Sequence, residues 1–176
     1  MAALLVDQFP VYLFRYQATG YWQMLNPDDF LSVVAKTPLV SIDLVLVRPD
    51  GSTLLGQRNN RPAQGYWFVP GGRINKDESL AGALQRISLR ELGVDLSVFP
   101  QRWLGAYEHF YPDNFAGVEG VSTHYVVLAH RIDVPADFVC MPADDQHAAL
   151  EWWGVADLLS SAKVHPNTQA YFQGVE

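Results

Sequence analysis

The chain has 176 residues, of which 49% are hydrophobic, and its formal net charge is −7 at pH 7. This length and composition predict one domain with a sizeable core, and the acidic balance argues against a protein that coats nucleic acid. The single cysteine, Cys140, excludes an internal disulfide and fits a reducing compartment. We therefore predict a cytoplasmic protein, and no membrane span, because no apolar run reaches the roughly 18 residues that a span needs.

The first 23 residues are aromatic-rich and apolar but lack a basic start and a small-residue cleavage site, so a signal peptide is not expected. We predict a weakly ordered N-terminal extension over residues 1–23 and one domain over residues 24–176. The alternative for the extension is an arm that contacts a second subunit.

The next segment predicts a helix followed by a strand. Asn26 or Asp28 can cap a short helix over residues 30–36, and residues 41–47 alternate as a strand does. Asp43 lies inside this strand. A polar residue there usually faces water, and a role in a site is the alternative.

A turn over residues 48–51 leads to a return strand over residues 52–55. The loop after it is rich in glycine and proline and carries Arg58 and Arg61. Arginines on loops are commonly only solvated. Together with Arg73 and the backbone N–H groups of a nearby glycine turn, however, they would suit the oxygens of a diphosphate.

Residues 67–94 read as a strand, a glycine turn and a helix. A short apolar run ends at Pro70-Gly71-Gly72, and Asp77 or Ser79 can then cap a helix. One apolar stripe follows at helical spacing, and Gly93 ends the helix. The stripe consists of Leu80, Ala83, Leu84 and Ile87.

Glu91 points the same way as this stripe, seven residues after Leu84. A carboxylate on a buried face is costly unless it is paired or bound to a metal. Three explanations are open: the last turn frays and Glu91 reaches solvent, Glu91 pairs with Arg86 or Arg90, or it binds a metal ion.

The second half predicts two long strands, over residues 101–111 and 121–131, joined by a glycine-containing loop. His109, Tyr111 and Tyr125 either line a cleft or form the polar side of a sheet. An irregular stretch over residues 134–146 leads to Gln146-His147, and then to a strand over 150–155 and helices near 156–159 and 167–172. By pattern alone this mixture is α/β or α+β.

The strand–turn–helix resembles the box of the Nudix hydrolases, G-x5-E-x7-R-E-U-x-E-E-x-G-U, in which U is aliphatic. The chain departs from the box at three positions, where Ile87 and Arg90 replace glutamates and Ser88 replaces an aliphatic residue. The resemblance implies a Nudix α/β/α sandwich with a mixed sheet between helices. The matching residues are Gly72, Glu78, Arg86, Glu91, Gly93 and Val94.

With this degenerate box, the chain is similar to one subfamily, the GDP-mannose mannosyl hydrolases. The similarity covers most of the chain from Met24 onward. It includes the segments Thr37–Val45, Leu54–Arg73, His109–Phe115, Ser122–Leu128, Asp144–Trp153 and Val164–Phe172.

The resemblance implies a reaction in which water attacks the anomeric carbon of a GDP-sugar, with inversion, and GDP leaves. It further implies one Mg²⁺ per active site, held by the Gly71 carbonyl, Glu91 and Gln146. His147 is the implied general base, with His109 as its rival.

The remaining roles are implied in the same way. Arg58 and Arg73 would stabilise the departing diphosphate, Tyr125 would donate a hydrogen bond to it, and Arg86 would orient. Asp43 would hold a sugar hydroxyl or orient the leaving group. Met24 and Phe30 would lie near the nucleotide across a homodimer, and Arg58 would also bind substrate.

Two other functions stay open. One is an ordinary Nudix pyrophosphohydrolase that releases GMP and sugar 1-phosphate, and the missing glutamates at positions 87 and 90 argue against it. The other is a non-catalytic domain that binds a nucleotide sugar. GDP-glucose and GDP-fucose would fit the same reasoning as GDP-mannose, since small differences between sugars are discriminated modestly.

Overall fold

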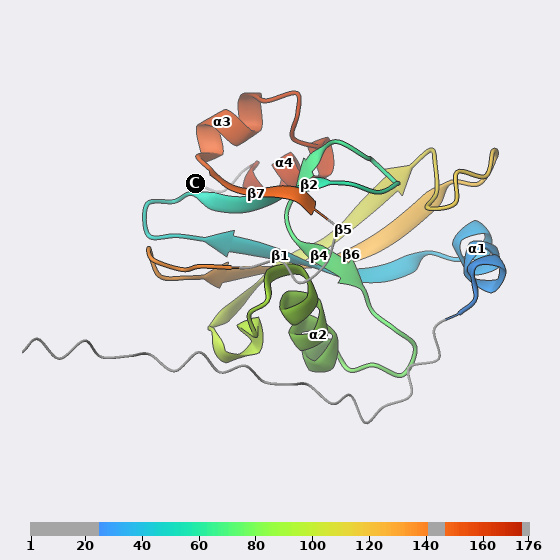
Figure 1. Ribbon diagram of the computed structural model, residues 1–176, viewed down its shortest axis with the longest axis horizontal. Coiled ribbons are helices and arrows are strands. Elements are labelled where there is room, and N and C mark those ends of the chain that lie inside the picture. Colours follow the sequence, from blue (N-terminus) through green and yellow to red (C-terminus); the bar gives the residue numbers. More distant parts are fainter. Residues whose placement is uncertain (1–24, 141–146, 174–176) are drawn as a thin grey trace, which may run out of the picture.

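The computed structural model describes residues 25–140 and 147–173 (Figure 1). The predicted N-terminal extension lies outside the described residues. The elements in chain order are α1 (Pro27–Lys36), β1 (Leu39–Val47), β2 (Thr53–Arg58), β3 (Trp67–Phe68), β4 (Gly71–Arg73), α2 (Leu80–Leu92), the 3₁₀ turn η1 (Leu96–Val98), β5 (Gln101–Tyr111), β6 (Thr123–Asp133), β7 (His147–Trp153), α3 (Val155–Ser160), α4 (Pro166–Gln169) and the 3₁₀ turn η2 (Ala170–Phe172).

The seven strands form one mixed sheet. Five follow the order β3-β2-β1-β6-β5, while β4 pairs with β1 and β7 pairs with β2. Strands β1 and β6 run parallel, from Leu39 opposite Tyr125 to Val47 opposite Asp133, and the other pairs are antiparallel. Helix α2 lies on one face and α3 and α4 lie on the other (Figure 1). This arrangement confirms the predicted sandwich with a mixed sheet between helices.

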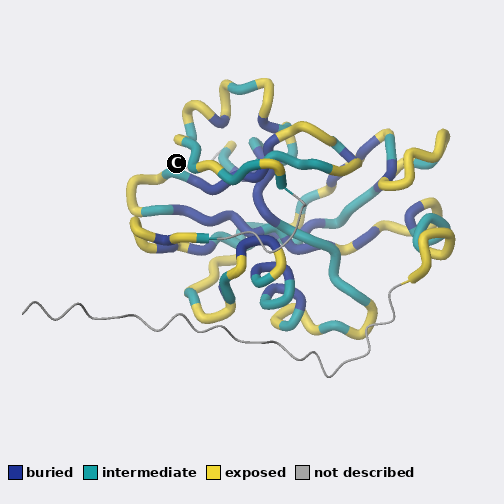
Figure 2. Tube along the Cα trace, viewed as in Figure 1, coloured by how far each residue is buried: buried dark blue, intermediate teal, exposed yellow. Residues whose placement is uncertain are grey.

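Strand β1 divides the core between the two faces. Since neighbouring side chains of a strand point to opposite faces, Ile42, Leu44 and Leu46 pack in one cluster with the apolar residues of α2. Val45 and Val47 belong to the second cluster, which includes residues from α3 and η2. Figure 2 shows β1 buried along nearly its whole length. Asp43 is in phase with Val45, so its side chain lies on the face covered by the C-terminal elements.

The cap and the stop of helix α2 follow from its sequence. Ser79 caps it, with the hydroxyl oxygen accepting from the Gly82 N–H at 3.1 Å, whereas Asp77 adopts a φ of 63° in the preceding turn. Gly93 ends the helix in the left-handed conformation, φ 69°. The predicted stripe is buried except for Leu80, which is 54% exposed in the first turn.

Two sequence-based predictions about strands are wrong in detail. Strand β7 begins at His147 rather than at residue 150, because His147 pairs with Arg58 of β2 ahead of the pairs that residues 150–153 form with the same strand. His147 therefore lies on a strand and not on a loop. Strict alternation over residues 101–111 also predicts Trp103 and His109 on one face of the strand. Strand β5 instead has a register shift between Trp103 and Gly105, which takes Trp103 out of phase with His109, and Trp103 is 53% exposed.

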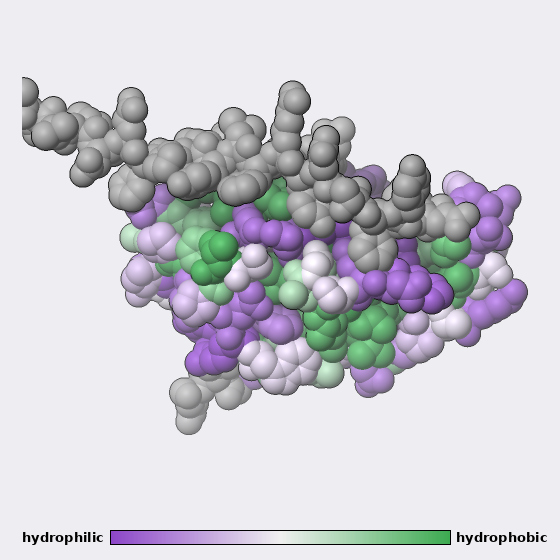
Figure 3. Space-filling view, turned by 90° about the horizontal axis from the view of Figure 1, so that it is seen from below, coloured by the Kyte–Doolittle hydropathy of each residue, from purple (hydrophilic) through white to green (hydrophobic). Residues whose placement is uncertain are grey.

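Among the described residues, no helix combines the length and the apolar character needed to cross a bilayer. Seen from the α2 side, hydrophobic and hydrophilic side chains are interspersed over the surface that the grey atoms leave visible (Figure 3).

Candidate active site

A cavity of about 420 Å³ opens where β1, β2, β4, β6 and β7 meet the C-terminal half of α2. Its walls bring together residues that lie far apart in the sequence. His109 and Tyr111 also line it, so of the two alternatives for His109, Tyr111 and Tyr125 the structure shows the cleft. The predicted site residues found in its walls are Asp43, Arg58, Gly71, Arg73, Glu91, Tyr125 and His147.

Glu91 is buried at the edge of this cavity, with 2% of its surface exposed. Its Oε2 accepts a hydrogen bond from the Gly71 N–H at 3.0 Å and lies 3.2 Å from His147 Nε2. Arg90 Nη2 is 3.5 Å from Oε1. The explanation in which Glu91 reaches solvent is therefore wrong, and so is a pairing with Arg86.

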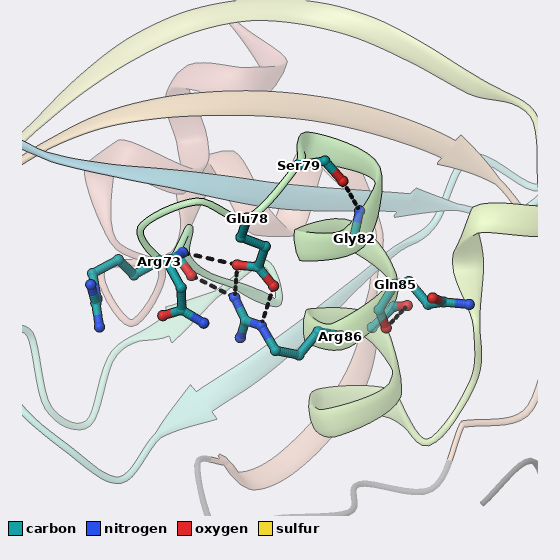
Figure 4. Close-up of polar contacts among 8 residues, drawn as sticks. Arg73, Glu78, Ser79, Gly82, Gln85 and Arg86 are labelled. Carbon is teal, nitrogen blue, oxygen red and sulfur yellow. Dashed lines mark hydrogen bonds and ion pairs between the residues drawn. The ribbon is translucent and has the colours of Figure 1, made fainter. Parts of the chain in front are cut away.

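Arg86 instead binds Glu78, which also lies in the matching box. Its Nε and Nη2 donate to the two carboxylate oxygens at 2.6 and 2.8 Å, and Nη2 also donates to the Arg73 carbonyl at 2.8 Å. Glu78 Oε2 accepts from the Asn75 N–H at 2.9 Å. Figure 4 shows the Arg73 side chain pointing away from this pair. Arg86 thus fixes the loop between β4 and α2, which agrees with an orienting role.

His147 is held between Glu91 and strand β2. The side chain is 6% exposed, and its Nδ1 is buried without a hydrogen-bond partner among the described residues. A Cβ atom on Gly56 would lie 2.3 Å from Nδ1. The glycine therefore leaves the space that the imidazole occupies, and Nε2 is the ring nitrogen directed at the carboxylate.

A second polar group lies across the cavity. The Tyr171 hydroxyl donates to Asp43 Oδ2 at 2.7 Å and lies 3.2 Å from His109 Nε2. Burial raises the pKa of Asp43 to about 7, although the hydrogen bond from Tyr171 lowers it. Burial also lowers the pKa of His109 to about 4. The expectation that Asp43 faces water is thus wrong, and His109 is a weak base in this environment.

Among the described residues, four arginines line the cavity: Arg58, Arg73 and, from α2, Arg86 and Arg90. The Arg58 guanidinium lies 5.4 Å from the Phe68 ring centroid, and its buried Nε has no partner among the described residues. Burial lowers the pKa of Arg73. Arg61 is exposed and lines a separate hollow that it shares with Arg58. Arg61, which the sequence groups with Arg58 and Arg73, therefore does not line this cavity.

Phe30 lies beside the cationic wall. Its ring is 4.7 Å from the Arg73 guanidinium carbon and 4.8 Å from the ring of Phe115 in the loop between β5 and β6. Tyr125 lies opposite His109 on neighbouring strands, and burial raises its pKa. The two other predicted site residues, Met24 and Gln146, lie outside the described residues.

The donor set at Glu91 fits one hard cation and does not fit several. Such cations take oxygen ligands, and Glu91 is the only acidic residue of α2. The box position of the first helix glutamate is occupied by Ile87, which is fully buried in the apolar core. Among the described residues, no three histidine, cysteine, aspartate or glutamate side chains are grouped as a metal site. The Glu91 carboxylate is thus the described candidate ligand for one ion, and the backbone of Gly71, whose N–H donates to Glu91, lies beside it.

Sequence reasoning missed two residues of this site. The sequence predicts a terminal helix around Tyr171 and no role for it, although buried tyrosine hydroxyls need partners. Gly56 was part of a glycine-rich loop, and only the pairing of β2 with β7 reveals that it adjoins His147.

Comparison with known proteins identifies relatives of the whole domain. Residues 37–173 match the sequence model described as NUDIX domain. The low-salt glycan biosynthesis protein Agl8 of Haloferax volcanii is 43% identical over 138 residues, which cover 78% of this chain and 84% of Agl8. The CTP pyrophosphohydrolase of Escherichia coli is 29% identical over 115 residues, 65% of this chain and 75% of that protein.

Solved structures have the same fold. The crystal structure of the MutT NUDIX hydrolase from Burkholderia pseudomallei matches with a TM-score of 0.64 and 25% identity, and the match covers 80% of this chain and all of that chain (100%). The NUDIX domain of Shewanella oneidensis NrtR, solved in complex with ADP ribose, matches with a TM-score of 0.60 and 23% identity over 85% of this chain and 96% of that chain.

Proposed function

The chain belongs to the NUDIX family of hydrolases, and within that family we propose that it hydrolyses GDP-mannose to GDP and free mannose with the help of one Mg²⁺. The observation that carries the proposal is the acid content of α2. Glu91 is its only acidic side chain, whereas attack at phosphorus in this family typically uses more than one metal ion on several helix glutamates. A site with one carboxylate suits a reaction that needs one metal ion rather than several.

The cavity supplies positive charge for a diphosphate leaving group. Arg58 and Arg73 line it, and the buried Arg58 Nε donates no hydrogen bond to any described residue, so it can donate to a phosphate oxygen. Tyr125 lines the same cavity and, since burial raises its pKa, keeps its proton and can donate it in a hydrogen bond. These groups would stabilise charge as it develops on the departing phosphate oxygens.

Glu91, the Gly71 carbonyl and Gln146 are the proposed ligands of Mg²⁺. When bound, the ion would neutralise charge on the diphosphate. The residues of the chain would hold the substrate and move the proton. Asp43 would bind a sugar hydroxyl or orient the leaving group, and Phe30, next to Arg73, would contact the nucleotide together with Met24.

His147 is the proposed general base. Its position beside Glu91 puts it at the same end of the cavity as the proposed Mg²⁺ ligands. It would accept a proton from water as the water oxygen bonds to the anomeric carbon. The bond from that carbon to the phosphate oxygen breaks, and GDP leaves with the electron pair. Because water attacks opposite the leaving group, an α-linked sugar would be released as the β anomer.

The name of the relative Agl8 supports a sugar-linked substrate, because that protein is described as acting in glycan biosynthesis. The proposal is tested by proton NMR of GDP-mannose incubated with the protein and Mg²⁺. We expect GDP and β-mannose as the first products. GMP with mannose 1-phosphate would contradict the proposal in favour of a pyrophosphohydrolase, and tight binding without turnover would contradict it in favour of a binding domain.

The family resemblance also leads us to propose a cytoplasmic homodimer. In such a dimer, Met24 and Phe30 would lie near the nucleotide across the interface. Sedimentation velocity measures the mass directly: a dimer is expected, and a monomer at micromolar concentration would contradict this part of the proposal.

A further inference from the structure

The C-terminal segment Val164–Phe172 lies against the inner wall of the cavity, and none of its residues has a role in the proposed reaction. Its first residue bridges to Trp67 of β3. The ring of His165 stacks on Phe68, with centroids 4.6 Å apart, and Phe68 lines the cavity. Tyr171 near the end of the segment is 3% exposed. This segment therefore contacts the cavity walls from the side opposite to α2.

Tyr171 joins two cavity residues from different strands. Its hydroxyl donates to Asp43 Oδ2 of β1 at 2.7 Å and meets His109 Nε2 of β5 at 3.2 Å. A tyrosine hydroxyl has one proton, and an ionised carboxylate can only accept. When Asp43 is ionised, the Tyr171 proton is committed to Asp43, so the hydrogen atom between Tyr171 and His109 must belong to His109 Nε2.

The protonation states of Tyr171 and His109 fit this arrangement. Burial raises the pKa of Tyr171 far above its ordinary value, so the phenol keeps its proton. Burial lowers the pKa of His109 to about 4, so the imidazole is neutral and carries one ring hydrogen. His109 then donates a hydrogen bond to Tyr171, and Tyr171 donates one to Asp43. The other carboxylate oxygen, Asp43 Oδ1, lies toward Gly71, where a Cβ atom would come within 2.5 Å of it.

We propose that Tyr171 is a positioning residue, which holds the Asp43 carboxylate with Oδ1 toward Gly71 and fixes His109 as the Nε2–H tautomer. The inference rests on the proposed function, since it assumes that the cavity is where the nucleotide sugar reacts. It assigns Tyr171 an effect on the reaction through Asp43 and no contact with substrate.

The kinetic test compares Tyr171→Phe with Tyr107→Phe, using GDP-mannose and Mg²⁺. Tyr107 is a matched control because its ring packs edge-on against Tyr171 at 4.7 Å and it does not line the cavity. Loss of one buried hydrogen bond predicts a fall in kcat of about tenfold for Tyr171→Phe, with KM changed less than about twofold. Equal losses in the two variants would overturn the proposal.

A double-mutant cycle separates positioning from general damage. If Tyr171 acts through Asp43, then Tyr171→Phe should cost less than about twofold in a protein that already carries Asp43→Asn, because the two effects share one contact. The same tenfold loss in both backgrounds would overturn the proposal. Thermal unfolding of each variant shows whether a lower kcat reflects a smaller folded fraction.

A spectroscopic readout needs neither substrate nor metal. In ¹⁵N NMR at pH 8, the His109 ring, assigned with His109→Gln, should show the hydrogen on Nε2, and Tyr171→Phe should shift the ring toward a mixture of tautomers. A His109 ring with the hydrogen on Nδ1 in the wild type would overturn the proposal. If the wild type does not hydrolyse GDP-mannose, the proposed function fails, and this readout still decides the role of Tyr171.

Discussion

The carboxylate Oε2 of Glu91 lies 3.2 Å from Nε2 of His147, although 56 residues separate the two in the chain. Glu91 belongs to the last turn of α2, and His147 is the first residue of β7. The two side chains are 2% and 6% exposed. This buried acid and this buried base are in contact at the edge of the cavity, and the proposed site is built around the pair.

Replacing Glu91 with Gln should weaken Mg²⁺ binding while preserving an acceptor for the Gly71 N–H. Loss of a charged oxygen ligand should raise the Mg²⁺ concentration needed for half-maximal activity at least about tenfold, the lower end of what even an outer-shell substitution costs. Activity titrations and calorimetry with MgCl₂ measure this. Glu119→Gln, on the exposed loop between β5 and β6, is the control. Unchanged activation by Mg²⁺ would exclude Glu91 as a ligand.

The two cavity histidines should respond differently to replacement by Gln. We expect His147→Gln to lower kcat by roughly 10²–10⁴, as loss of a general base does. His109 is tied to Tyr171 and, because burial lowers its pKa to about 4, is a poor base. Its replacement should therefore cost much less. Single-turnover rates with GDP-mannose measure both effects. A larger loss of rate in His109→Gln than in His147→Gln would make His109 the general base.

Gly56→Ala should reduce activity without removing any polar group. The new Cβ atom would lie 2.3 Å from His147 Nδ1, so the imidazole has to move by about 1 Å, a displacement that can cost about 10²-fold in rate. Gly154→Ala is the control, because a Cβ atom there meets only Asp157 at 3.5 Å. Wild-type kcat in Gly56→Ala would show that the position of His147 is not critical.

Ser88→Ala should destabilise the fold. The Ser88 side chain is fully buried and accepts the Leu96 N–H at 3.1 Å, which ties η1 to α2. A buried N–H left without an acceptor costs about 1–3 kcal/mol. Urea denaturation measures the loss, and Ser97→Ala, whose hydroxyl donates to Asp95 in an exposed turn, serves as the comparison. Equal stability of Ser88→Ala and wild type would refute the role.

Much of the fold follows from local patterns. A few consecutive residues are enough to predict each of several features: the alternation in β1, the Ser79 cap, the Gly93 stop and the apolar stripe of α2. The family box then predicts the order in which strand, turn and helix follow one another. The box departure at Ser88 has a structural reason that appears only in the fold, since its partner Leu96 lies beyond the helix end.

The site was predictable in part. A carboxylate on a buried stripe marks Glu91 without any structure, and the resemblance points to most of the other cavity residues. The sequence pattern alone predicts that Asp43 faces water. It shows that a strand residue is polar, but it does not show which elements cover that face of the sheet. It also gave no hint of Tyr171 or Gly56, whose roles depend on contacts with His109, Asp43 and His147 far away in the sequence.

The most direct test of the account is the position of the bond that breaks. GDP-mannose is incubated with the protein and Mg²⁺ in ¹⁸O-labelled water, GDP and GMP are examined by phosphorus NMR, and free sugar is examined by mass spectrometry. We predict GDP without label and mannose that carries it, because water attacks carbon. Label in GMP or in mannose 1-phosphate would mean attack at phosphorus and would contradict a single-carboxylate site built on Glu91.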